Sequence, residues 1–121
     1  MRVKAERIQN DLENLARFGK LEGGGISRLA FTSADREARQ YLQHSLAQQG
    51  LNTTQDAMGN MRARRSGIRN LAPVMIGSHL DSVPSGGCFD GVVGIVAALE
   101  VIRVLDEQGI KTLRPIDIIN F

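Results

Sequence analysis

The residues best suited to chemistry lie in the stretch Gly77 to Gly91, which reads GSHLDSVPSGGCFDG. It contains one histidine, His79, and two aspartates, Asp81 and Asp90. Imidazole nitrogens and carboxylate oxygens both bind divalent zinc, manganese or cobalt. The three side chains therefore predict part of a metal site, provided that the fold brings them together.

His79 and Asp81 are two positions apart, so in an extended segment their side chains lie on the same side. The Asp81 carboxylate would then accept the free ring N–H of a metal-bound His79 and fix its tautomer. The proline and glycines that follow allow a sharp turn, which would return Asp90 to the same point. The two oxygens of Asp90 could bridge two metals about 3.5 to 4 Å apart.

Each of these residues also has a purely structural alternative. His79 could be a hydrogen-bonded buried histidine, Asp81 a turn residue and Asp90 the N-cap of the next helix. The convergence of all three at one strand end favours a metal site. A phosphate loop fits less well, because the glycines match neither G-x-G-x-x-G nor the P-loop and Asp90 adds negative charge.

The elements before this stretch are predicted to be two helices and a hairpin. Apolar residues recur at helical spacing from Arg2 to Phe18, and a second helix is expected from Thr32 or Ser33 to Gly50. Runs of extended character then occupy positions 51–55 and 61–65, with Gly59 and Asn60 suited to a tight turn between them.

Four arginines lie in or just after the second run of the hairpin. They are Arg62, Arg64, Arg65 and Arg69. Such a cluster can mark a nucleic-acid footprint, but no aromatic residue is interleaved for base stacking. A solvated hairpin face, with no nucleic-acid partner, is the favoured interpretation.

The elements around the chemical stretch predict an α/β sheet. Pro73 to Ser78 is apolar on both faces and is predicted to be a buried central strand. Gly91 to Leu105 predicts an interior helix, and Pro115 to Phe121 a second buried strand. Strand, helix and strand make a right-handed crossover unit, and ligands of such sheets collect at the carboxyl ends of the strands.

Composition indicates a globular protein. The 121 residues are 42% hydrophobic with a net charge of +2, and no apolar run approaches the roughly 20 residues of a membrane span. The N-terminus does not resemble a secretory signal, and the single Cys88 excludes an intramolecular disulfide. A cytoplasmic protein without a membrane partner is expected. The sequence ends on an apparently central strand, which predicts a domain cut short at its C-terminus.

The segment GSHLDSVPSGGCFDGVVGIVAALEVIRVL resembles the amidase branch of the zinc-dependent metallopeptidase and aminoacylase superfamily. This branch contains N-carbamoyl-L-amino-acid hydrolases, ureidopropionases and allantoate amidohydrolases. GGISRLAFTSADREARQYLQ and DAMGNMRARRSG are similar to the same branch in the same order. The resemblance implies that residues 1–121 are the N-terminal portion of a catalytic metal-binding domain with a mixed-sheet, three-layer α/β/α fold. A lid and dimerisation domain would be absent.

The resemblance also implies residue roles in a site with two divalent ions (Zn, Mn or Co). His79 would be a terminal ligand of one ion, Asp90 the carboxylate that bridges both, and Asp81 the residue that orients the His79 ring. In the family, the strand that matches IDIINF leads into a pair of glutamates, a general base and a further ligand. This chain ends at Phe121, before that pair, so the implied site is incomplete.

The implied activity is that of a metal-dependent hydrolase acting on non-peptide C–N bonds. Its substrates would be N-carbamoyl-L-amino acids or related ureido acids, and the complete enzyme would be a homodimer. With two ligands and no general base, the isolated chain is expected to bind metal weakly and to be inactive. One alternative is a non-catalytic remnant or interaction module that self-associates through exposed edges. Another is a metallopeptidase or dipeptidase of the same superfamily.

Overall fold

The structure is a computed structural model that describes residues 2–121. Those residues form α1 (Ala5–Leu15), α2 (Ser33–Ala47), β1 (Thr53–Gln55), β2 (Met61–Arg65), β3 (Val74–Ser78), α3 (Val92–Glu107) and β4 (Ile116–Asn120). The strands join in one mixed sheet of order β1-β2-β4-β3. β2 is antiparallel to both β1 and β4, whereas β3 and β4 are parallel.

The parallel strands β3 and β4 are connected by α3, which lies against both of them. Parallel neighbours need such a crossover because a short turn can join only antiparallel strands. α3 is apolar around most of its circumference, and nine of its sixteen residues are buried. The predicted interior helix is therefore confirmed. Within residues 2–121 no helix has both the length and the apolar character to cross a membrane.

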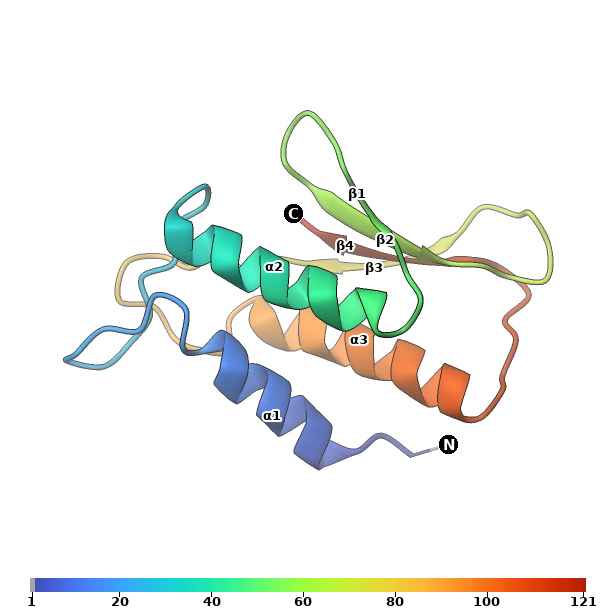
Figure 1. The fold of residues 1–121 in the computed structure, drawn as a ribbon, viewed down its shortest axis with the longest axis horizontal. Helices are drawn as coiled ribbons and strands as arrows, with labels where there is room; N and C mark the ends of the chain where they lie inside the picture. The colour runs from blue at the N-terminus through green and yellow to red at the C-terminus, as the bar shows by residue number, and fades with distance from the viewer. Residues whose placement is uncertain (1) are drawn as a thin grey trace.

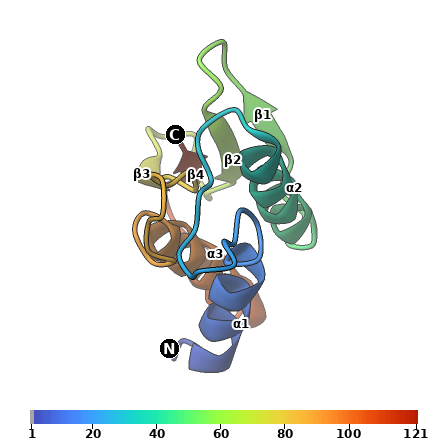
Figure 2. The ribbon, with the colours of Figure 1, turned by 90° about the vertical axis from the view of Figure 1, so that its left-hand side faces the viewer.

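The three helices lie on one side of the sheet (Figure 1). α3 packs directly on β3 and β4, α1 packs against α3, and α2 approaches β1, as the end-on view in Figure 2 also shows. The mixed α/β class predicted from the sequence is confirmed. Of the three layers expected, the described residues build the sheet and one helical layer.

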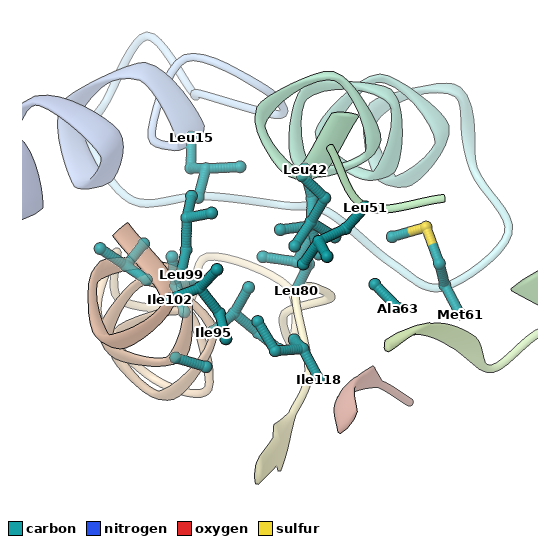
Figure 3. Close-up of a cluster of buried hydrophobic side chains, with 14 of the residues drawn as sticks. Leu15, Leu42, Leu51, Met61, Ala63, Leu80, Ile95, Leu99, Ile102 and Ile118 are labelled. Carbon is teal, nitrogen blue, oxygen red and sulfur yellow. The ribbon is translucent and has the colours of Figure 1, made fainter. Parts of the chain in front are cut away.

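The hydrophobic core lies between the sheet and the helices (Figure 3). Leu15 from α1, Leu42 from α2, Leu99 from α3 and Ile118 from β4 all contribute, and each is at most 2% exposed. Leu80, which follows β3, is fully buried in the same cluster. The core therefore joins every helix to the segment that carries the candidate chemistry.

The prediction of a buried central strand at positions 73–78 is wrong. β3 is an edge strand, and Val74 and Met75 are 51% and 60% exposed. The central parallel strand is β4, whose five residues are all buried. An apolar run shows that a strand can be buried on both faces, but only its neighbours decide whether it is. Within residues 2–121, β4 is the one strand that pairs with β3.

The predictions of the first two helices are confirmed with shorter limits, whereas the tight hairpin turn is not confirmed. The Thr32 side chain caps α2 by accepting a hydrogen bond from Asp35 N (3.4 Å), as the capping interpretation expected. In the hairpin, Gln55 pairs with Met61, which leaves a five-residue loop. Asp56 Oδ1 accepts from the backbone N–H of two loop residues at 2.9 Å each, and this side chain stabilises the longer loop.

The solvated arginine face is also only partly correct. Arg64 donates to both carboxylate oxygens of Asp117 on β4, at 2.6 and 2.8 Å. Arg65 pairs with Asp106 at the end of α3 (2.8 Å). The hydrogen bonds from Arg64 hold the pKa of Asp117 below its ordinary value. The hairpin arginines therefore join the hairpin to β4 and to the end of α3, which sequence spacing alone did not indicate.

Candidate metal centre

His79 and Asp81 lie just beyond the carboxyl end of β3, at the sheet end where β4 also finishes. Phe121 N donates to the Ser78 carbonyl oxygen (2.9 Å), so the two strands stay joined up to this point. The His79 and Asp81 side chains are 39% and 36% exposed. The strand-end location is as predicted, and His79 is not the buried histidine of the structural alternative.

The His79 ring is held by Asp81 through two groups. His79 Nδ1 lies 3.0 Å from the Asp81 backbone oxygen and 3.3 Å from Asp81 Oδ1. The sequence pattern indicated the carboxylate, but the carbonyl is the closer acceptor. Both acceptors favour a proton on Nδ1, and in the neutral ring this leaves the lone pair on Nε2. Nε2 is therefore the ring atom available to a metal ion.

The return of the chain at Asp90 and Gly91 places backbone directly against the His79 ring. Gly91 has φ +69°, and a Cβ there would lie 2.5 Å from His79 Cε1 and Nε2. Only glycine allows both this conformation and this approach. Gly91 is also the N-cap of α3, and it makes no side-chain capping bond. The alternative of Asp90 as the N-cap is therefore wrong, and the Asp90 side chain is exposed.

The donor types fit one side of a metal site. His79 Nε2 and the Asp90 carboxylate are a nitrogen and an oxygen donor of the kind that zinc accepts. Within residues 2–121, however, no group of three or more His, Cys, Asp or Glu side chains is arranged to hold a metal ion. The other histidine, His44, is exposed on α2 and lies 3.1 Å from Gln48 Nε2. The described residues thus supply a partial donor set.

A buried amide lies at the same end of the sheet. Asn120 is the last residue of β4 and pairs with Ser78 in the parallel register. It is 0% exposed, and neither Oδ1 nor Nδ2 has a hydrogen-bond partner within residues 2–121. Buried polar groups in folded proteins nearly always have a partner. An unsatisfied polar group is therefore one more feature of this sheet end.

Arg28 is a residue of this region that sequence reasoning missed. Its guanidinium is buried and donates to the Leu80 carbonyl oxygen, in the middle of the His79–Asp81 segment. The one available signal was a charged residue inside the run ISRLAF, where neighbouring apolar side chains suggested burial. No motif spacing connected Arg28 with a loop more than fifty positions later.

Comparison with known proteins identifies the family. Residues 60–121, which include β2, β3, α3 and β4, match peptidase family M28. The chain belongs to peptidase family M28. This M28 chain contains His79, Asp81 and Asp90 within the matched part.

Similar sequences define the branch of the family. The M28 chain is 38% identical over 120 residues to N-carbamoyl-L-amino acid amidohydrolase from Geobacillus stearothermophilus. This match covers 98% of the chain and 29% of that protein. The chain is 38% identical over 120 residues to ureidoglycolate hydrolase from Arabidopsis thaliana, covering 98% of the chain and 25% of the relative. The predicted resemblance to the amidase branch, a branch of enzymes, is confirmed. The chain spans less than a third of each relative.

Solved structures agree with the predicted fold. A hydantoinase/carbamoylase family amidase from Burkholderia ambifaria matches with a TM-score of 0.95 and 42% identity over 98% of this chain and 30% of that chain. Aminopeptidase PepT from Bacillus cereus matches over 98% of this chain and 36% of that chain, with a TM-score of 0.78. Its identity of 19% shows a shared fold alone. The M28 chain thus has the fold of part of a larger α/β domain.

Proposed function

We propose that residues 1–121 are the N-terminal portion of the catalytic, metal-binding domain of an amidohydrolase. Its substrates would be N-carbamoyl-L-amino acids or related ureido acids, and the names of the similar amidohydrolases support this class. The observation that carries the proposal is the Gly91 turn. It brings the backbone that follows Asp90 against the ring of His79, whose Nδ1 already has acceptors.

Each side chain has a distinct part in this proposal. His79 would hold one of two divalent ions through Nε2, and Asp90 would bridge both ions with its two oxygens. Asp81 would keep the proton on Nδ1 and so preserve the lone pair of Nε2. Zinc, manganese or cobalt, when bound, polarises a substrate carbonyl and lowers the pKa of a bound water. The exposed side of His79 leaves room for a substrate to approach.

The isolated chain is expected to be inactive. A catalytic zinc usually has three protein ligands and an open position, whereas His79 and Asp90 supply two. Further ligands, the general base and a lid domain with homodimer contacts would belong to a longer protein in the cytoplasm. Incubation of the purified 121 residues with zinc and an N-carbamoyl-L-amino acid should release no ammonia. Measurable turnover would contradict this part of the proposal.

Metal binding provides the direct test. Calorimetric titration of the chain with Zn²⁺ should show weak binding. The zinc affinity should fall at least tenfold in His79→Ala and in Asp90→Asn. His44→Ala is the matched control, because it removes an exposed histidine elsewhere on the chain. Equal losses in His79→Ala and His44→Ala would indicate adventitious binding and reject the metal centre.

The exposed β3 edge favours a second candidate, an interaction module that associates with another copy of itself. Val74, Met75 and Phe121 are each more than half exposed, and β3 carries no charged residue to block edge pairing. Light scattering on the purified chain separates the candidates. A defined dimer that does not bind zinc would favour the module, whereas a zinc-binding monomer would favour the amidohydrolase.

The family match itself favours a peptidase as a further candidate, since the matching family is named for peptidases. A peptidase would share the metal ligands and differ in the substrate. A longer protein that contains this chain could be assayed with an N-carbamoyl amino acid and with a dipeptide of the same residue. We expect hydrolysis of the former alone.

A further inference from the structure

A short segment near the N-terminus is paired with the loop that carries the candidate chemistry. Ile26 and Gly86 exchange two backbone hydrogen bonds, at 2.9 and 2.8 Å. Ser82 N donates to the Arg28 carbonyl oxygen (2.8 Å), and Arg28 N donates to Ser82 Oγ (2.9 Å). Residues 26–28 therefore act as a backbone template for the loop, although more than fifty positions separate the two.

The Arg28 side chain continues this connection into the core. It is 1% exposed, and its Nε donates to the Leu80 carbonyl oxygen at 2.6 Å. Its Nη1 donates to the carbonyl oxygens of Leu15 and Phe18, at 2.7 and 2.9 Å. One guanidinium thus joins the end of α1 to the backbone between the two candidate site residues.

The charge of Arg28 is costly in this position. Burial lowers the pKa of the guanidinium, an effect that the charges of Asp35 and Asp81 partly offset. Asp35 is itself paired with Arg39, so Arg28 is neutralised mainly by carbonyl dipoles. A hydrophobic side chain of similar length would fill the same space without this desolvation cost. Packing alone therefore does not account for an arginine here.

The position of Leu80 shows what the arginine controls. The Leu80 side chain is fully buried in the core (Figure 3), while its carbonyl is held by Arg28. With both groups of Leu80 fixed, alternation along the extended segment directs the side chains of His79 and Asp81 away from the core. A shift of this backbone would move the ring and its acceptor together.

We propose that Arg28 is the positioning residue of the His79–Asp81 segment, holding the Leu80 carbonyl so that the His79 ring stays against the Gly91 turn. This inference rests on the proposed metal centre. The fork of the guanidinium reaches the Leu80 carbonyl and the carbonyls at the end of α1 at the same time, which a single ammonium group cannot match. Arg28→Lys should therefore lower the zinc affinity and should not act as a conservative change.

The test compares Arg28→Met with Arg103→Met. Arg103 is also largely buried, but it pairs with Asp11 at the contact between α1 and α3 and, within residues 2–121, makes no hydrogen bond to the loop. In Arg28→Met, the amide hydrogens of Ser82 and Gly86 should exchange at least tenfold faster relative to Ile118, since their acceptors lie on the template segment. Zinc affinity should fall about 10- to 100-fold, as for other residues that support a metal ligand. Arg103→Met should change neither the relative exchange rates of Ser82 and Gly86 nor the zinc affinity.

Ser82→Ala keeps the proposal testable if Arg28→Met does not fold. It removes one hydrogen bond of the same connection, and about a fivefold loss of zinc affinity is expected. Unchanged zinc affinity in folded Arg28→Met or in Ser82→Ala would overturn the positioning role. Failure of the unmodified chain to bind zinc would instead reject the metal centre. The exchange rates of Ser82 and Gly86 would then decide by themselves whether Arg28 holds the loop.

Discussion

The two faces of β4 are both buried, but by different means. On the inner face, Ile116 and Ile118 pack into the helix-covered core. On the outer face, Asp117 is 1% exposed in its side chain because Arg64 lies across it and holds both carboxylate oxygens. Apolar packing excludes water from one side, and a charged pair partly excludes it from the other. The inner face should therefore resist changes in pH and salt, whereas the outer face should respond to both.

The largest effect is expected from an inner-face substitution. Ile118→Ala removes a side chain that is 2% exposed in the centre of the core, and such truncations cost about 2 to 5 kcal/mol through lost burial and the cavity left behind. Urea unfolding at neutral pH measures the change. The loss should be the same at pH 7 and pH 4.5. A loss that varied strongly with pH would show that the inner face is not the apolar element described.

The outer face should lose stability in acid. Because Arg64 lowers the folded pKa of Asp117, its stabilisation is fully present above the unfolded pKa of about 3.9 and disappears as the pH falls through the folded value. Asp117→Asn should cost about 1.5 to 3 kcal/mol at pH 7, the range for hydrogen bonds to a charged group. The difference between variant and wild type should shrink in acid. Unfolding curves from pH 7 to pH 2 would show this convergence, and parallel curves would contradict it.

The turn at the carboxyl end of the sheet can be tested with Gly91, and Gly50, which follows α2, is the control. Gly91→Ala and Gly50→Ala both place Cβ at positive φ, +69° and +71°, and the left-handed conformation costs each about 1 to 2 kcal/mol. Only the Gly91 Cβ meets the His79 ring, since nothing lies within 4 Å of the Gly50 Cβ. Gly91→Ala should therefore also weaken zinc binding. Equal zinc affinities in the two variants would show that the Gly91 turn does not contribute to zinc binding.

The smallest effect on folding is expected at the exposed edge. Met75→Lys changes a side chain that is 60% exposed on β3, so unfolding should shift by no more than about 0.5 kcal/mol. A lysine on an edge strand opposes pairing with another strand. Any dimer seen by light scattering should dissociate in this variant. Persistence of the dimer would assign self-association to another surface.

The candidate site was predictable where its residues are close in sequence. His79 and Asp81 are two positions apart, and the glycines before Asp90 signal a turn, so local geometry alone indicated the His79–Asp81 contact and the return of the chain to the His79 ring. Arg28 was not predictable in this way, because the fold rather than the chain brings it to Leu80. The sequence also did not indicate that His79 Nδ1 lies closer to the Asp81 carbonyl (3.0 Å) than to its carboxylate (3.3 Å), since small differences in backbone placement decide it.

The sequence by itself determined the α/β class, the helices, the apolar strands and the pairing of His79 with Asp81 at a strand end. Periodicity and short-range spacing express these features directly. Only the tertiary structure decided that β3 lies at an edge and β4 at the centre, and that Arg64 covers Asp117. It also decided that Arg28 donates to the Leu80 carbonyl oxygen between His79 and Asp81. These features depend on contacts between distant positions, and the same apolar or charged residue is compatible with several neighbours until the chain has folded.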